Sequence, residues 1–199
     1  MNLAKKGMIM IAVVLAAGMV LTACSNKANE NSTSSSNVSS SASQSVSNVN
    51  LAQVIVGARS SEDNEVLEVL TGKKGESASY EHNPNDVDSA EADSAAEMVF
   101  TTLNIKQEDL EEYAFSISLV NIKAYAVGIF KPVSEKAQEV KNALEEYLKN
   151  TQNMFERYLE DQYEIAKDAK LKELSDGTIL LVMSENSNEV LSKIEKALS

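Results

Sequence analysis

The chain contains few of the residues from which metal centres and cross-linked folds are built. Its 199 residues include one cysteine, one histidine and no tryptophan. A single cysteine cannot form a disulfide framework, and a single histidine has no partner for a histidine-based metal cluster. The glycine and lysine cluster at residues 72–75 lacks the spacing and the following hydroxyl residue of a phosphate-binding loop. The sequence therefore predicts neither a metal ion nor another cofactor.

Positive charge is also scarce. The chain has 18 lysine and arginine residues against 30 aspartate and glutamate residues, a formal net charge of -12 at pH 7. Proteins that bind nucleic acid need a clustered excess of basic residues to contact the phosphates. The composition therefore predicts that nucleic acid is not a partner of this protein.

Residues 1–23 have the three-part arrangement of a secretory signal peptide. Lys5 and Lys6 precede an apolar run from Met8 to Leu21, and small residues follow the run. The run is shorter than the stretch of about 20 apolar residues that a membrane-spanning helix requires. We therefore expect this segment to direct export rather than to span the membrane.

The tetrapeptide that ends at Cys24 resembles the bacterial lipobox, in which the cysteine is acylated and becomes the new N-terminus. Each buried methylene of an acyl chain such as palmitate adds about 0.8 kcal/mol of membrane affinity, and two chains anchor a protein stably. We expect lipid on Cys24 to hold this lipoprotein at the outer face of the bacterial cytoplasmic membrane. Anionic headgroups repel an acidic chain, so the lipid is expected to be its membrane contact.

Residues 24–50 are expected to form a disordered tether behind the lipidated cysteine. Between Ser25 and Asn50 there are 11 serines and 6 asparagines, with only scattered apolar residues. Such a composition cannot supply a packed core. A flexible chain of this length has a root-mean-square span of about 28 Å, enough to separate a folded domain from the headgroups.

Residues 51–88 are poorly defined by their pattern and could be helical in part. The apolar run Leu51–Val56 is followed by a candidate short helix at Asn64–Leu70, which Gly72 would end. Residues 75–88 are polar, and we expect them to form a loop.

Four acidic residues in and after this loop invite comparison with a calcium-binding loop: Asp86, Asp88, Glu91 and Asp93. The glycine that such a loop needs at its sharp turn is missing. We therefore interpret the group as a solvated acidic face or as the start of a helix. His82 lies nearby without a second histidine or cysteine, and we interpret it as a solvent-exposed loop residue.

Residues 89–199 show the patterns of a globular α+β domain. Alternation over residues 113–120 predicts a half-buried strand with Tyr113, Phe115, Ile117 and Leu119 facing inward. The other patterns predict a helix near residues 90–103, a strand at Ala124–Phe130, a long helix from Ser134 to about Asp161, a hairpin of Ala169–Leu174 and Thr178–Ser184, and a last helix opened by a capping box of Asn186 and Glu189.

This order of elements predicts a two-layer α+β fold. The layers are an antiparallel sheet of about four strands in two hairpins and, on one face of it, a long helix with shorter helices. The opposite face, which carries Ala114, Ser116 and Ser118, is expected to be open to solvent. That face is the first candidate for a binding surface.

Several segments of the domain carry a family resemblance. They are the run Glu108–Ser118, the strand Ala124–Phe130, the helix with Phe155, Tyr158, Gln162 and Tyr163, and the Asp176-Gly177 turn followed by Ile179–Ser184. Over about residues 90–198 the sequence resembles DUF4358, a domain of unknown function in small lipid-anchored proteins of Gram-positive bacteria. The resemblance implies no activity, cofactor or catalytic residue.

Candidate catalytic groups are few. Five of the six tyrosines are considered as sources of a catalytic hydroxyl, Tyr113, Tyr125, Tyr147, Tyr158 and Tyr163, but Tyr147 and Tyr158 follow the apolar stripe of the long helix and are expected in the core. The adjacent carboxylates Glu111 and Glu112 point to different sides of their element and cannot flank one substrate bond. No catalytic residue is predicted.

The sequence thus favours a non-catalytic binding or interaction module at the cell envelope. Its partners would be the membrane, through the lipid on Cys24, and an envelope protein or a small ligand. Two alternatives stay open. One is an extracytoplasmic enzyme without recognisable catalytic residues, and the other is an accessory protein of envelope stress or sporulation that has no small ligand.

Overall fold

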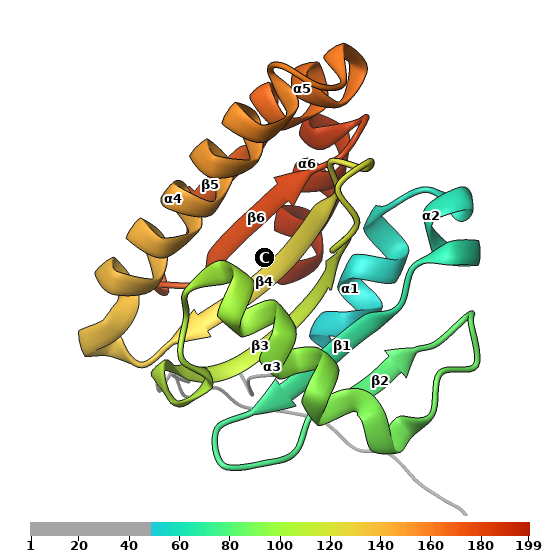
Figure 1. Ribbon diagram of the computed structural model, residues 1–199. Helices are drawn as coiled ribbons and strands as arrows, with labels where there is room; N and C mark the ends of the chain where they lie inside the picture. The colour runs from blue at the N-terminus through green and yellow to red at the C-terminus, as the bar shows by residue number, and fades with distance from the viewer. Residues whose placement is uncertain (1–48) are drawn as a thin grey trace, which may run out of the picture. The chain divides into compact units, whose positions relative to one another are not determined.

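The computed structural model describes residues 49–199, so the predicted signal peptide and the predicted lipidation of Cys24 lie outside the described residues. The described chain forms a six-stranded antiparallel sheet in the order β2-β1-β3-β4-β6-β5 (Figure 1). Its strands are β1 (Val69–Lys73), β2 (Ser79–His82), β3 (Leu110–Ile117), β4 (Ala126–Pro132), β5 (Lys170–Glu173) and β6 (Ile179–Met183). The expected α+β class, the antiparallel sheet and both expected hairpins are confirmed.

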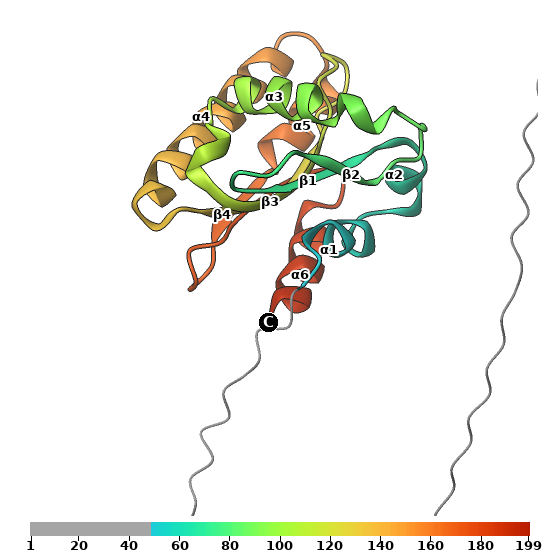
Figure 2. The ribbon, with the colours of Figure 1, turned by 90° about the horizontal axis from the view of Figure 1, so that it is seen from below.

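Helices cover both faces of this sheet. They are α1 (Leu51–Ala58), α2 (Ser61–Val66), α3 (Ala92–Leu103), α4 (Ala137–Phe155), α5 (Glu160–Lys167) and α6 (Ser187–Leu198), with short 3-10 turns at Ser89–Glu91, Gln107–Asp109 and Ser134–Lys136. Figure 2 shows α3, α4 and α5 on one side of the sheet and α1 and α6 on the other. Each side has its own cluster of buried apolar side chains.

The expectation of helices on one face only is therefore wrong. Every residue of β6 and the first five residues of β4 are buried, and a strand that is apolar on both sides needs cover on both sides. Ala114 and Ser116, expected on an open face, are 0% and 3% exposed because α1 packs over them. The small side chains of this face allow a helix to approach closely; they do not mark a solvent side.

Residues 51–88 contribute two helices to the fold and two strands to the same sheet, so the expected count of about four strands is wrong. The expected helix at Asn64–Leu70 is instead the short α2 followed by β1, because Leu70 and the next three residues pair with β3. The expected polar loop contains β2, an edge strand whose side chains are exposed or half-buried. A short polar edge strand resists further strand pairing, and it leaves no apolar pattern in the sequence.

The long helix is shorter than expected. It ends at Phe155, and α5 begins at Glu160 after Leu159 adopts an extended backbone with φ -139° and ψ 103°. The break allows α5 to fold back, so that Gln152 donates a hydrogen bond to the Ala166 carbonyl at 3.0 Å. Tyr158 lies in the break and is 65% exposed, so its expected place in the core is wrong, whereas Tyr147 packs against the core.

The capping box expected at the last helix does not form. The side chain of Asn186 makes no capping hydrogen bond, and Glu189 pairs with Lys193 at 2.7 Å. The preceding turn is held instead by Ser187, whose hydroxyl accepts a bond from the Ser184 amide at 3.1 Å and donates to the Ser184 carbonyl at 2.9 Å. The Ser187 hydroxyl thus closes the turn before α6 and does not cap the amides of its first turn.

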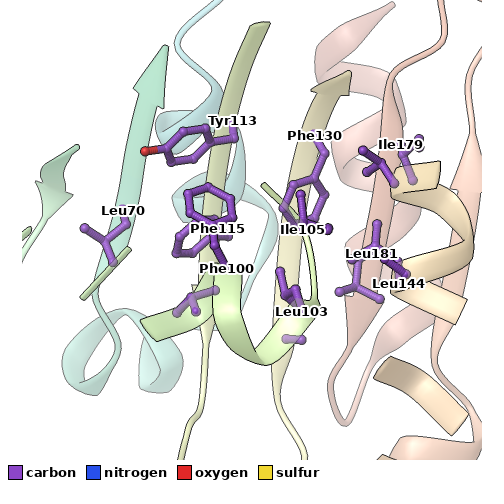
Figure 3. Packing of buried hydrophobic residues seen from close by; sticks show 14 of the residues in the cluster. Leu70, Phe100, Leu103, Ile105, Tyr113, Phe115, Phe130, Leu144, Ile179 and Leu181 are labelled. Atoms are coloured by element: carbon purple, nitrogen blue, oxygen red, sulfur yellow. The ribbon is translucent and has the colours of Figure 1, made fainter. Parts of the chain in front are cut away.

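Aromatic rings form the centre of the cluster beneath α3 (Figure 3). Phe100 of α3 meets Tyr113 and Phe115 edge-on at centroid distances of 4.9 and 5.5 Å. Tyr113 and Phe115 stack at 5.4 Å, and Phe115 lies 6.4 Å from Phe130. Gly72 leaves room for this packing, because a Cβ there would lie 2.3 Å from the Tyr113 hydroxyl.

The two ends of α6 lie beside different parts of the described chain. Val49, where the described chain begins, lines a hollow together with Ala197 near the end of α6. The connection between β3 and β4, residues 118–125, lies at the other end of α6, where it shares a hollow with Asn186. The described chain therefore begins near the end of α6 that lies away from the β3–β4 connection.

Candidate functional site

The β3–β4 connection carries three exposed apolar side chains in close succession. Leu119, Val120 and Ile122 are 39%, 58% and 64% exposed. We call these three residues the apolar crest. Leu119 was expected to face inward as part of a longer strand, but β3 ends at Ile117, so that expectation is wrong.

Other exposed apolar residues gather around the crest. Within the described residues the large exposed hydrophobic side chains are Val66, Met98, Leu119, Val120, Ile122, Met154 and Tyr158. All except Tyr158 line one of two hollows on either side of the connection. Single exposed apolar residues are ordinary on a protein surface, whereas a contiguous group marks an interaction site.

The two hollows differ in chemistry. The smaller, of about 370 Å³, lies between the crest, α3 and α4 and is lined by Met98, Met154 and Phe155 among others, with Lys123 as its one charged residue. The larger, of about 800 Å³, lies between the crest, α2, α5 and the start of α6. It is lined by five acidic residues, Glu62, Asp63, Glu65, Glu185 and Glu189, and by two basic ones, Lys123 and Lys193.

Ion pairs neutralise only part of this charge. Asp63 pairs with Lys123 at 3.5 Å, and Glu189 pairs with Lys193 at 2.7 Å. The other three carboxylates, Glu62, Glu65 and Glu185, are exposed and form no ion pair within the described part of the chain. We call these three the acidic rim. The larger hollow therefore combines an apolar edge with a net negative charge.

Hydrogen bonds hold the connection in place from both sides. The Ala124 amide donates to the side chain of Gln162 on α5 at 2.8 Å. The Ser118 amide donates to the Tyr125 carbonyl at 3.0 Å, and the Lys123 amide donates to the Val120 carbonyl at 3.3 Å. The crest is thus presented by a closed turn between two strands of the sheet, which limits the entropy that binding would cost.

A buried arginine forms hydrogen bonds at both ends of the connection. Arg59 is 4% exposed and donates to Asn64 Oδ1 at 2.6 Å, the Leu67 carbonyl at 2.6 Å, Ser116 Oγ at 2.7 Å and the Tyr125 hydroxyl at 3.3 Å. It forms no ion pair with a carboxylate of the described residues. Its neighbours Ala58 and Ser60 line the larger hollow together with Tyr125.

The same cluster sets the ionisation of Tyr125. Burial raises the pKa of the Tyr125 hydroxyl, and the adjacent Arg59 guanidinium opposes this effect. Lys123 lies 5.3 Å from the centre of the Tyr125 ring, in the geometry of a cation–π contact. Tyr125 therefore links the Arg59 guanidinium to the connection that carries the crest. Its hydroxyl stays neutral at physiological pH.

Sequence reasoning missed Arg59. It is one of two arginines in the chain, and it directly follows the apolar run of α1. Two of its acceptors, Ser116 and Tyr125, lie 57 and 66 residues away. A lone arginine after an apolar run was a usable signal for burial, but its partners depend on the pairing of β3 with β4.

The residues singled out in the sequence as possible metal ligands are not brought together. The imidazole Nε2 of His82 lies 2.6 Å from the Asn64 carbonyl, Asp88 caps a 3-10 turn, and Asp93 accepts a bond from the Ala78 amide at 2.6 Å. His82 is half-buried at the end of β2, so its expected exposure in a loop is wrong. Within residues 49–199, no three side chains of histidine, cysteine, aspartate or glutamate are placed to hold one metal ion.

The paired carboxylates and tyrosines considered as catalysts also separate. Glu111 pairs with Lys74 at 3.5 Å, whereas Glu112 pairs with Lys131 at 2.7 Å. The hydroxyl of Tyr113 points toward β1 and is buried without a hydrogen-bond partner (Figure 3). Burial, and secondarily the Asp93 carboxylate, raises the pKa of Tyr113 to about 12. A neutral, buried phenol of this kind is neither a base nor a nucleophile at neutral pH.

Replacing Tyr113 with phenylalanine is expected to leave the free energy of unfolding unchanged or to raise it by up to about 1 kcal/mol, because an unpaired buried hydroxyl is removed. The pKa of about 12 lies above the ordinary value of 10.0, so the folded state holds this proton more tightly than the unfolded state. Its contribution to stability is complete below pH 10 and is lost as the pH rises toward 12. Tyr113→Phe should therefore lose less stability over this interval.

Urea unfolding of both proteins at pH 8 and pH 11 measures this difference. Lysines also deprotonate in the alkaline range, so the comparison is between variant and wild type at each pH. A loss of more than about 1 kcal/mol in Tyr113→Phe at pH 8 would mean that the hydroxyl has a partner.

The fold and the site together define a class: a three-layer α+β protein that presents an apolar crest and an acidic rim at one end of its sheet. Residues 83–184 match the family described as Domain of unknown function (DUF4358). The chain belongs to this family, and the resemblance noted in its sequence is confirmed. No match was found among curated proteins or solved structures. Over residues 49–199, no helix has the length and apolar composition needed to cross a membrane.

Proposed function

We propose that this protein is a lipid-anchored, extracytoplasmic binding module that contacts an envelope partner and catalyses no reaction. The observation that supports binding is the gathering of six exposed apolar side chains around one connection of the sheet. A surface of this kind loses contact with water when a partner covers it, and that loss is the main driving force of protein association. The anchor restricts the search for the partner to the envelope.

The lipobox supports the envelope location. The chain's single cysteine, Cys24, directly follows a charged start, an apolar run and small residues. The body that follows is acidic, and anionic headgroups repel such a body. Lipid on Cys24 would therefore fasten the protein to the membrane while leaving the folded part in the aqueous phase.

Replacing Cys24 with alanine is expected to release the protein from the membrane, because no thiol remains to carry the acyl chains. Subcellular fractionation should move more than about 90% of the protein from the sedimenting to the soluble fraction, since two acyl chains contribute nearly all of the membrane affinity. Mass spectrometry of the wild type should show a mature N-terminus at a diacylated Cys24. Protease added to intact protoplasts should digest the wild-type protein.

Ser25→Ala is the matched control, because it changes the neighbouring residue and leaves the thiol in place. It is expected to sediment like the wild type. The anchor is not the lipid if Cys24→Ala protein that lacks residues 1–23 still sediments in high salt, or if the wild-type cysteine is found unmodified.

A further inference from the structure

We infer that the apolar crest and the acidic rim together bind a cationic amphipathic segment of an envelope protein. This inference rests on the proposed function and adds the chemistry of the partner to it. In this arrangement the apolar side chains of the segment cover Val120 and Ile122, and its lysines or arginines face Glu62, Glu65 and Glu185. The crest supplies the apolar contact, and the rim selects the sign of the partner's charge.

The apolar half of the surface has the form of a ridge between two depressions. Val120 lines both hollows, and Ile122 lines the larger one together with Val66 of α2. Met98 and Met154 border the smaller hollow, and methionine side chains adapt to apolar groups of different shape. A segment with apolar residues on one face can therefore cover the crest and place side chains in the hollows beside it.

The charged half of the surface decides which segment fits. The acidic rim offers three exposed carboxylates without an ion pair, whereas both lysines of the larger hollow are already paired. An acidic or neutral segment would leave these carboxylates facing like charge or no charge. A cationic segment would pair with them, and the attraction would also steer its approach.

The same charges disfavour two other possible occupants of this surface, an anionic lipid membrane and a second copy of this chain. An anionic lipid surface would bring phosphates against Glu62, Glu65 and Glu185. A second copy of this chain, docked by two-fold symmetry, would bring two acidic rims together. Both arrangements place like charges at short range, so a cationic protein segment is the occupant that the surface favours.

The test uses the full mature protein as the cell makes it, held in phosphatidylcholine nanodiscs where it is lipidated. The probe is a labelled helical peptide of about 18 residues with leucines on one face and lysines on the other. Fluorescence anisotropy at about 0.05 M salt measures the dissociation constant, and a repeat at about 0.5 M salt should weaken binding because exposed charges are screened. A peptide with glutamates in place of the lysines should not bind.

Two groups of variants separate the apolar and charged contributions. Val120→Ser with Ile122→Ser is expected to weaken peptide binding by about tenfold or more, because two apolar contacts are lost. Glu62→Gln, Glu65→Gln and Glu185→Gln combined should weaken it by about fivefold to tenfold at low salt and have little effect at high salt. All five residues are exposed, and thermal unfolding should confirm that the fold is intact.

Matched controls lie elsewhere on the surface. Glu76, Glu81 and Glu145 are exposed, form no ion pair within the described chain and line neither hollow beside the crest. Their combined change to glutamine alters the net charge by the same amount and should change binding by less than about twofold if the rim acts locally. Tyr158→Ser removes an exposed apolar side chain outside both hollows and should have no effect.

The inference is overturned if the wild type does not bind the cationic peptide, or if the crest variants bind it as well as the wild type does. It is also overturned if changing the control glutamates weakens peptide binding as much as changing the acidic rim does. If the crest variants lost binding to phosphatidylglycerol vesicles but still bound the peptide, the crest would be assigned to lipid binding. If the wild type were a dimer in light scattering and the crest variants were not, the crest would be assigned to self-association. Fractionation of Cys24→Ala tests the anchor separately, so either proposal can fail while the other stands.

Discussion

Replacing Phe115 with alanine is expected to lower the free energy of unfolding by about 4 kcal/mol, the typical loss for a large buried aromatic side chain. Phe115 is 1% exposed and lies in the middle of β3, a central strand. Its ring contacts the rings of Phe100, Tyr113 and Phe130, so its removal opens a cavity among aromatic side chains that cannot collapse to fill it. The loss is therefore expected to fall within the usual range of about 3–5 kcal/mol.

Urea denaturation followed by circular dichroism measures this change, with the slope of the transition checked for constancy. Phe115→Leu keeps most of the volume and should lose about 1–1.5 kcal/mol. Tyr158→Ala removes an aromatic ring that is 65% exposed and should change stability by less than about 0.5 kcal/mol. A loss below about 2 kcal/mol in Phe115→Ala would contradict the packing of this cluster.

The aromatic row was predictable because it repeats with the period of a strand. Tyr113 and Phe115 alternate with smaller residues, and both are buried on the face that α3 covers. The opposite face was not predictable in the same way. Ser116 has the polarity of a solvent-facing residue, but its hydroxyl accepts a hydrogen bond from the buried Arg59. Polarity alone does not separate an exposed serine from one that is buried and satisfied by a distant side chain.

The edge strand β2 and the break between α4 and α5 could not be predicted from the sequence for other reasons. The edge strand β2 is short and polar, so its sequence matches that of a loop, and its strand conformation depends on pairing with β1. The apolar positions of α4 continue with helical spacing up to Tyr158 and Leu159, but the extended backbone of Leu159 ends that register. A tertiary contact, the packing of α5 onto α4, overrides the local pattern.

The candidate site depends on which apolar residues remain uncovered. Leu119, Val120 and Ile122 have the composition of a strand, and only the early end of β3 at Ile117 leaves them in a connection. The acidic rim combines residues of α2 with Glu185, which are more than 100 positions apart in the chain. Neither half of the site is a motif, so the sequence alone could indicate an envelope protein but not the surface it offers.

Replacing Arg59 with methionine is expected to lower the free energy of unfolding by about 3 kcal/mol. Methionine has a similar length and keeps the packing, but its sulfur donates to none of the four acceptors that the guanidinium satisfies. A buried acceptor left without a donor costs about 1–3 kcal/mol, and removal of the buried charge offsets part of the sum. The guanidinium joins the end of α1 to α2, to the segment before β1, to β3 and to the β3–β4 connection, so its loss is also expected to loosen that connection.

Urea denaturation of Arg59→Met and of Arg157→Met compares the chain's two arginines, of which Arg157 is exposed and should change stability by less than about 0.5 kcal/mol. Arg59→Lys keeps the charge, but its single ammonium cannot reach all four acceptors, so it should lose about 2 kcal/mol. If Arg59→Met were instead more stable than the wild type, the desolvation of the guanidinium would outweigh its hydrogen bonds. The arginine would then be retained at a cost to stability, and hydrogen exchange of the 118–125 amides would show whether it positions the crest.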